Sequence, residues 1–144
     1  MKKNLKLFVD MDGVLADFNA ETNAVQRFKT ERGFFKKLKP IEANVKAVKM
    51  LLNSGYDVTI LTTSPHASAD KDKRKWVNKY LGKKIEIIFA RPEIAKIDYV
   101  KEKDVAVLFD DYGKNIREWI GGGGKKAIKI SPNYSMLDEI VRGI

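Results

Sequence analysis

The sequence of 144 residues contains no cysteine. Disulfide bonds, thiolate metal sites and thiol nucleophiles are therefore excluded. It also has no apolar run close to the roughly 20 residues that a membrane-spanning helix requires. Lysines at positions 2 and 3 are similar to the start of a signal peptide, but Asp10 and Asp12 interrupt the apolar stretch that follows. We therefore predict that the chain is not exported and has a cytoplasmic location.

Acidic residues are outnumbered, with 19 Asp and Glu against 28 Lys and Arg, which gives a formal net charge of +9. A basic surface attracts anionic partners at long range, and nucleotides, sugar phosphates and nucleic acids all qualify. The basic residues are scattered over clusters at 36–39, 71–75 and 125–129 instead of forming one arm or helix. Nucleic acid is therefore a possible but not a favoured partner, and most of this charge is interpreted as solvated surface.

Short β-branched runs alternate with amphipathic segments along the chain. The pattern predicts strands at 5–10, 58–61, 85–89, 105–109 and 127–130, with helical segments between them. Pro40 is expected at the first position of one helix, and Ser68 or Asp70 at the N-cap of the next. Such alternation indicates an α/β fold with a doubly wound, three-layer (Rossmannoid) parallel sheet of five core strands, in a single domain over 1–144.

Polar residues end three of the predicted strands. Asp10 ends the first strand, the segment 62–64 (Thr-Thr-Ser) the second, and Asp110-Asp111 the fourth. Ligands of doubly wound sheets bind beyond the carboxyl ends of the strands. The convergence of these residues therefore predicts an active site at this edge of the sheet.

The pattern Asp10-x-Asp12-Gly13 has two interpretations. Asp and Gly favour turns, so it could simply end a strand. Because residues two apart in a strand point the same way, the two carboxylates could also share one small volume. Asp10 would then be a nucleophile and Asp12 a general acid and base, while Gly13 would let backbone N–H groups approach a phosphoryl oxygen.

The carboxylates at 110–111 could be a solvated strand end, but near the first pair they would repel it unless a cation lay among them. The available ligands are oxygens, and His66, the single histidine, is interpreted as a surface residue. Hard oxygen ligands of this kind point to Mg²⁺.

Hydroxyl and lysine side chains complete the candidate site. Thr63 and Ser64 could cap a helix or bind phosphoryl oxygens. Lys96 is the candidate phosphate-binding lysine because it lies between the third and fourth predicted strands, and Lys101 is its rival. The four glycines at 121–124 do not fit the P-loop pattern and are interpreted as a turn that ends a helix.

These residues resemble, in chain order, the four motifs of the haloacid dehalogenase-like (HAD) phosphatase superfamily. The matching positions are Asp10-Met11-Asp12-Gly13, Thr63, Lys96 and Asp110-Asp111. The segment 9–18 (VDMDGVLADF) is more specifically similar to the 5′(3′)-deoxyribonucleotidases, as are 63–65, 79–82 and 33–35. The resemblance implies Mg²⁺-dependent hydrolysis of a phosphate monoester, a (deoxy)nucleoside monophosphate, through an aspartyl-phosphate intermediate.

The resemblance also implies a role for each residue. Asp10 would attack phosphorus, and Asp12 would protonate the leaving group and then activate water. Mg²⁺ would bind the Asp10 carboxylate, the backbone carbonyl of Asp12 and Asp111, which is preferred over Asp110. Phosphoryl oxygens would be held by Thr63, Ser64 and Lys96.

Only the segment 19–32 stands where that family has a substantial cap, so we predict a minimal cap and an open site. Phe18, Phe34 and Phe35 are candidates to stack on a base, but each could equally belong to the core. An open site leaves nucleic-acid ends and sugar phosphates as alternative substrates. A phospho-accepting domain similar to response-regulator receivers is a further alternative, which Asp12 disfavours because it supplies a second carboxyl for turnover.

Overall fold

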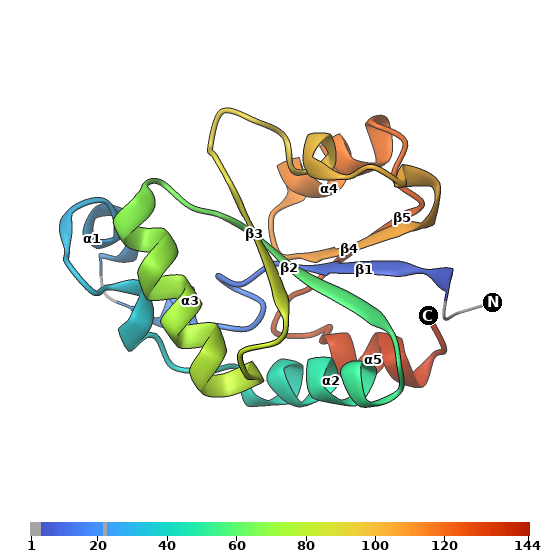
Figure 1. The fold of residues 1–144 in the computed structure, drawn as a ribbon, viewed down its shortest axis with the longest axis horizontal. Helices are drawn as coiled ribbons and strands as arrows, with labels where there is room; N and C mark the ends of the chain where they lie inside the picture. Colours follow the sequence, from blue (N-terminus) through green and yellow to red (C-terminus); the bar gives the residue numbers. More distant parts are fainter. Residues whose placement is uncertain (1–3, 22) are drawn as a thin grey trace.

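A computed structural model describes residues 4–21 and 23–144, and Figure 1 shows its central sheet. The sheet is entirely parallel, with the strand order β3-β2-β1-β4-β5. Its strands are β1 (Lys6–Val9), β2 (Asp57–Thr63), β3 (Glu86–Ala90), β4 (Ala106–Asp110) and β5 (Lys126–Lys129). The predicted α/β fold with five parallel strands is confirmed. The candidate leader at 1–3 and position 22 of the predicted cap lie outside the described residues.

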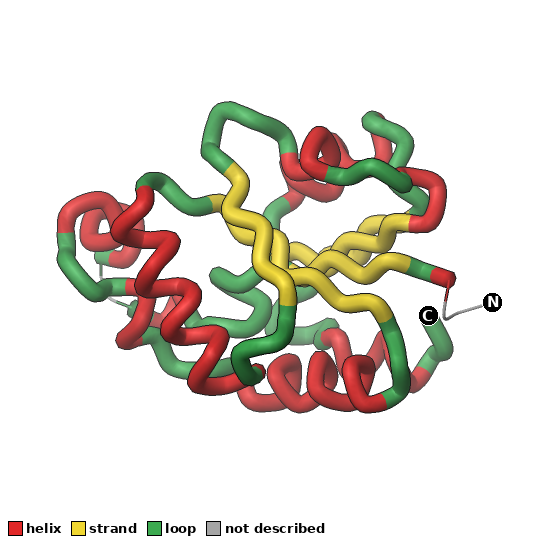
Figure 2. Tube along the Cα trace, viewed as in Figure 1, coloured by secondary structure: helices red, strands yellow, loops and turns green. Residues whose placement is uncertain are grey.

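Helices cover both faces of the sheet, so the strands form the middle of three layers (Figure 2). One face carries α2 (Glu42–Asn53), α3 (Ala67–Leu81) and α5 (Met136–Val141), with α2 and α5 side by side in Figure 1. The other face carries α4 (Gly113–Gly121) and the 3-10 turns η4 (Lys96–Tyr99) and η5 (Lys103–Val105). None of the helices in the described ranges is long and apolar enough to cross a membrane.

The alternation of β1 explains why both faces are buried. Leu7 and Val9 point into the core beneath α2, α3 and α5, whereas Phe8 points to the opposite core. There the Phe8 ring packs against Trp119 of α4, with 5.5 Å between ring centroids. Neighbouring residues of one strand therefore bind different helices to the sheet.

The helix α2 begins later than the sequence predicts. Pro40 forms an isolated antiparallel bridge with Ala16, and the helix starts at Glu42. The N–H of Ile41 donates to the carbonyl of Leu15 over 2.7 Å, which anchors the loop after β1 to the start of α2. Proline therefore serves as an extended residue before the helix, and its expected first-turn position is wrong.

His66 caps α3, so neither Ser68 nor Asp70 is the N-cap. The Nδ1 atom of His66 accepts a hydrogen bond from the N–H of Ala69 over 3.1 Å. Asp70 instead receives two hydrogen bonds, of 2.9 and 2.7 Å, from the Arg91 guanidinium at the end of β3. Asp70 therefore lies inside the helix and pairs with a residue distant in sequence.

Among the described residues between β1 and α2, one short α-helix, α1 (Ala24–Thr30), lies between the 3-10 turns η2 (Phe18–Ala20) and η3 (Phe35–Lys37). Its phenylalanines form a cluster. Phe18 lies 5.9 Å from Phe28 and 5.7 Å from Phe34, measured between ring centroids. Figure 1 shows this segment beside α3, at the end of the sheet where the polar residues gather.

Candidate active site

The centre of the candidate site lies where β1 and β4 end side by side. Asp10 directly follows β1, and Asp110 is the last residue of β4. The N–H of Asp10 donates to the carbonyl of Phe109 over 2.9 Å, so the ladder continues to the first carboxylate. The strand order reverses between β1 and β4, and doubly wound sheets bind ligands at such a point.

Three carboxylates converge at this point. Each of Asp10, Asp110 and Asp111 has one carboxylate oxygen that lies within 4.8 Å of those of the other two. Burial, and then the charge of Asp110, raises the pKa of Asp10 well above its ordinary value. The same two causes raise the pKa of Asp111. A cluster of hard oxygen donors that is costly to ionise fits a divalent cation such as Mg²⁺, which would offset the repulsion.

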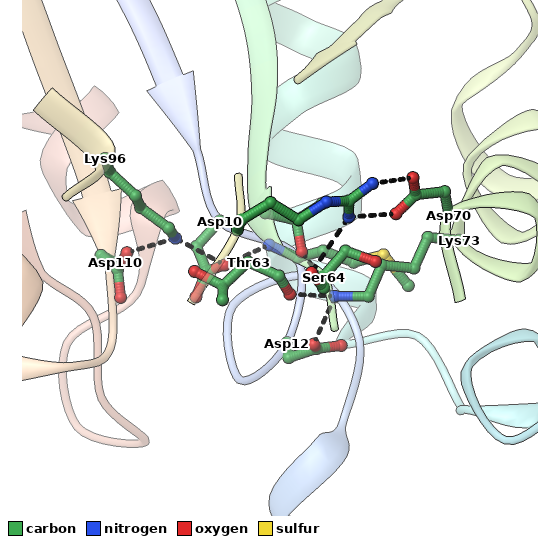
Figure 3. Close-up of polar contacts among 11 residues, drawn as sticks. Asp10, Asp12, Thr63, Ser64, Asp70, Lys73, Lys96 and Asp110 are labelled. Atoms are coloured by element: carbon green, nitrogen blue, oxygen red, sulfur yellow. Dashed lines mark hydrogen bonds and ion pairs between the residues drawn. The ribbon is translucent and has the colours of Figure 1, made fainter. Parts of the chain in front are cut away.

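Lys96 bridges two members of this cluster (Figure 3). Its Nζ lies 3.0 Å from Oδ1 of Asp10 and 2.7 Å from Oδ2 of Asp110, and the side chain is buried. Although burial alone would lower it, these two carboxylates hold the pKa of Lys96 above its ordinary value. Lys101 instead lines a separate cavity with Lys6 at the amino ends of the strands. The structure therefore brings Lys96, and not its rival, to the site.

The two carboxylates at the end of β4 differ in their partners. Oδ1 of Asp110 accepts from the N–H of Tyr112 over 2.9 Å. Its Oδ2 accepts from Asn115 over 3.1 Å as well as from Lys96. Both oxygens of Asp110 are thus occupied by donors of the chain, whereas Asp111 is half-buried and faces the loop that contains Gly13.

Gly13 makes room for the Asp111 carboxylate. Its φ is +85°, and a Cβ at this position would collide with Oδ2 of Asp111. The N–H of Gly13 already donates to the carbonyl of Ala16 over 2.8 Å. Its own N–H is therefore engaged in the loop, and the expectation that Gly13 lets backbone N–H groups approach a phosphoryl oxygen stays a prediction.

Asp12 lies apart from the carboxylate cluster and pairs with a lysine of α3. The Nζ of Lys73 lies 2.9 Å from Oδ2 of Asp12 and 2.7 Å from both Oγ1 of Thr62 and the carbonyl of Thr63. Figure 3 shows Lys73 and Lys96 approaching from opposite sides, one toward Asp12 and the other toward Asp10. The two carboxylates of the Asp-x-Asp pattern therefore have separate lysine partners.

A cavity of about 600 Å³ opens above these residues. Asp10, Asp12, Thr63 and Lys96 contribute to its lining. One wall is aromatic and apolar, made by Phe18, Val25, Phe28 and Phe35. The opposite wall is mixed, made by Pro92, Ile94, Tyr112, Lys114, Asn115 and Glu118.

The lining of this cavity does not include three of the residues expected to contact the substrate, Gly13, Phe34 and Ser64. Phe34 is buried under Phe18 as part of the core. Ser64 is also fully buried, and its N–H donates to the carbonyl of Ala90 over 2.8 Å. Its own carbonyl accepts from Arg91 over 3.1 Å, so its backbone groups hold β2 and β3 together.

A family model now places the chain among known proteins. The family described as 5′ nucleotidase, deoxy (pyrimidine), cytosolic type C protein (NT5C) matches residues 19–136. The chain belongs to this family. A protein of Vibrio phage KVP40 assigned as a 5′(3′)-deoxyribonucleotidase is 33% identical over 88 residues. That match covers 54% of this chain and 51% of the phage protein, so the chain spans about half the length of this relative.

Solved structures share the fold of this NT5C-family chain. A chain of the Pnkp1/Rnl/Hen1 RNA repair complex matches with a TM-score of 0.63 and 15% identity, over 87% of this chain and 42% of that one. A Thermotoga maritima protein assigned as a β-phosphoglucomutase matches with a TM-score of 0.58 and 12% identity, over 97% and 100%. These likenesses show the fold alone. Together with the family match they confirm the HAD-like resemblance.

The sequence-based reasoning missed Lys73, which this NT5C-family chain places at the site. A signal for it exists in the sequence. Ala69, Trp76 and Val77 are the buried residues of α3, and Lys73 lies on the same face, four residues after the first. A lysine on the apolar face of an amphipathic helix requires a buried partner, and that requirement sets it apart from the solvated lysines.

Proposed function

We propose that this protein is a Mg²⁺-dependent phosphomonoesterase that hydrolyses (deoxy)nucleoside monophosphates through an aspartyl-phosphate intermediate. The observation that carries the proposal is the placement of Asp10 and Asp12, each paired with its own buried lysine, on the floor of one cavity. Membership of a family of 5′-nucleotidases supports the choice of substrate class.

The reaction proceeds in two displacement steps at phosphorus. A carboxylate oxygen of Asp10 attacks phosphorus, the bond from phosphorus to the leaving oxygen breaks, and Asp12 gives its proton to that oxygen. In the second step Asp12 takes a proton from water, the water oxygen attacks phosphorus, and the bond to Asp10 breaks. Inorganic phosphate leaves, and both side chains return to their starting states.

The donor set at the strand ends fits Mg²⁺. The Asp10 carboxylate, the backbone carbonyl of Asp12 and Asp111 would hold the ion, and the full set of donors on Asp110 supports the choice of Asp111. When bound, the ion would supply positive charge to the phosphoryl oxygens. Thr63 and Lys96 line the cavity and would bind the same oxygens from the chain's side.

The aromatic wall suits a nucleobase. Phe18, Phe28 and Phe35 present ring surface on the Asp12 side of the cavity, and Phe28 was not among the residues expected from the sequence. A base stacked on these rings would place its sugar near the acid Asp12. The segment 19–32 thus would act as a minimal cap that contributes a wall instead of a lid. The cytoplasmic location also stays a prediction.

A phosphate-release assay tests the proposal. Purified protein is given 5′- and 3′-deoxynucleoside monophosphates and sugar phosphates, with Mg²⁺ or with EDTA. We expect release from the nucleotides in Mg²⁺ only, and acid-stable trapping of a phosphorylated Asp10 in a short reaction. Release from none of the substrates in Mg²⁺ would refute the phosphatase assignment, and equal release in EDTA would refute the metal dependence.

One observation favours a second substrate class, nucleic-acid ends. Lys114 lines the mixed wall, and a Cβ on the adjacent Gly113 would lie 3.2 Å from Nη1 of Arg117 and 3.9 Å from Nζ of Lys129. These three exposed cations form no ion pair with the described residues, and they could bind a second phosphate of a strand. The fold neighbour in an RNA repair complex is consistent with such a substrate.

An oligonucleotide with a terminal phosphate separates the two classes. If strand ends are the substrate, kcat/KM on the oligonucleotide exceeds that on the mononucleotide, falls steeply with added salt, and falls in Arg117→Gln. If mononucleotides are the substrate, the mononucleotide is preferred and Arg117→Gln changes little. The receiver-like alternative receives no support from the family match.

A further inference from the structure

Lys73 is a fully buried lysine whose three hydrogen bonds all converge on the active-site side of α3. They reach Asp12, Thr62 and the carbonyl of Thr63 over 2.7–2.9 Å. The Nζ also lies 4.4 Å from the centroid of the Phe35 ring, a favourable position for a cation. Three hydrogen-bond acceptors and a ring face therefore fix the ammonium group in one place.

This arrangement gives the two carboxylate oxygens of Asp12 different surroundings. An ammonium can only donate hydrogen bonds, so Oδ2 of Asp12 must be an acceptor in its contact with Lys73. Oδ1 is buried and has no hydrogen-bond partner among the described residues. The ion pair with Lys73 is therefore the contact that orients the Asp12 side chain.

A purely structural role accounts poorly for such a lysine. The neighbours of Lys73 on the buried face of α3 are Ala69, Trp76 and Val77, so its ammonium group is the charged group of an otherwise apolar face. Burying an ammonium group is costly, and a charged pair in a core is often no more stable than apolar packing. The benefit of the lysine is therefore to be sought at Asp12, the partner that also lines the cavity.

We propose that Lys73 is a positioning residue that holds the carboxyl group of Asp12 at the cavity, in the place from which Asp12 acts on the leaving oxygen of the substrate. Phe35 joins the lysine to η3, in the segment before α2. The inference rests on the proposed function, because it assigns Asp12 the role of the acid.

The dependence of the rate on the leaving group tests this role. A sugar alkoxide needs a proton to leave, whereas p-nitrophenolate leaves readily without one. We compare kcat/KM for dTMP and for p-nitrophenyl phosphate, because this ratio reports events only through the first displacement and is insensitive to the later role of Asp12 as a base. In Lys73→Met we expect about a 10²-fold loss on dTMP and only a several-fold loss on p-nitrophenyl phosphate.

Three further variants make the comparison decisive. Asp12→Asn should show the same selective loss, because it removes the proton itself. Lys75→Met, on the exposed face of the same helix, is the matched control and should leave both substrates unchanged. If Lys73→Met does not fold, the nearly isosteric Thr62→Val removes one of the three acceptors of the ammonium and should show the same pattern more weakly.

The outcomes separate the inference from the function on which it rests. If the native protein hydrolyses neither compound, the proposed function fails, and the inference fails with it. If the native protein is active but folded Lys73→Met loses both substrates equally, or neither, the positioning role is refuted and the phosphatase assignment stands. If only Thr62→Val folds, an equal loss on both substrates, or no loss on either, refutes the positioning role in the same way.

Discussion

The ammonium group of Lys96 lies 2.7 Å from the carboxylate of Asp110, and both side chains are buried. The same ammonium reaches Asp10, so one cation offsets two of the three carboxylates in the cluster. Neither carboxylate has a second lysine or arginine among its ion pairs within the described part of the chain. The stability of this edge of the sheet therefore depends on a single side chain.

Lys96→Met should destabilise the metal-free protein strongly. Removing one partner leaves uncompensated charge in the interior, which costs about 3–5 kcal/mol of unfolding free energy. Mg²⁺ should restore more stability to this variant than to the native protein, because the ion replaces the missing charge. Urea unfolding with Mg²⁺ and with EDTA measures both effects. Lys101→Met, an exposed lysine at the other end of the strands, should change the free energy by less than about 0.5 kcal/mol.

Asp10→Asn should abolish hydrolysis without harming the fold. An amide can neither attack phosphorus nor carry the charge that holds a cation, so phosphate release should fall by about 10⁴-fold or more. The same change removes one of three repelling carboxylates, so the melting temperature in EDTA should not fall. Phosphate release and thermal unfolding of one preparation give both results. Retained activity would end the assignment of Asp10 as nucleophile.

The sheet and the place of the site could be predicted because their signals are local. The apolar run that ends at Val9 defines a buried strand, and Asp10 follows it directly. Asp110 ends a second such strand. In a parallel sheet both carboxyl ends must meet at one edge, so no knowledge of distant contacts was required.

The partners within the site could not be predicted because they depend on distant contacts. Spacing could not identify the partner of Lys73, since Asp12 lies 61 positions away. Asp110 and Asp111 differ in their hydrogen-bond partners because Lys96 donates to Asp110. The order of residues in the chain does not show which of the two carboxylates the lysine contacts. Asp70 likewise pairs with Arg91, which follows β3 and lies 21 positions away.

The carboxylate cluster should make the stability of the metal-free protein fall as the pH rises. The pKa values of Asp10 and Asp111 are raised in the folded state above the ordinary value of 3.8. Above pH 3.8 the folded chain therefore binds more protons at these groups than the unfolded chain does. Their contribution to stability is complete below that value and is lost as the pH rises through the raised pKa.

Other groups also change the stability with pH. Arg91 lowers the pKa of Asp70, so the contribution of Asp70 to stability increases as the pH rises. A comparison with and without Mg²⁺ separates the effect of the cluster from such titrations. Because the ion favours ionised carboxylates, the gain in melting temperature on adding Mg²⁺ should grow over the pH range above 3.8 in which these raised pKa values lie. Asp111→Asn should reduce that growth. A gain that is constant across this range would contradict the placement of the cation among these carboxylates.

Gly13→Ala should weaken both the fold and the metal site. The left-handed backbone at Gly13, with φ of +85°, costs a non-glycine residue about 1–2 kcal/mol. The added Cβ would also push the Asp111 carboxylate out of its position. We therefore expect a loss of stability greater than the backbone cost alone, together with a weaker response of the melting temperature to Mg²⁺.

Gly123→Ala separates these two contributions. Gly123 also has a positive φ, of +98°, but a Cβ there would meet no atom within 4 Å. This variant should lose only the backbone cost and should keep the full response to Mg²⁺, because it lies in the turn after α4 and touches no carboxylate of the cluster. Since both variants carry similar backbone strain, the difference between their Mg²⁺ titrations measures what the empty space beside Asp111 contributes to holding the ion. Identical titrations would mean that Asp111 does not need that space to bind the cation.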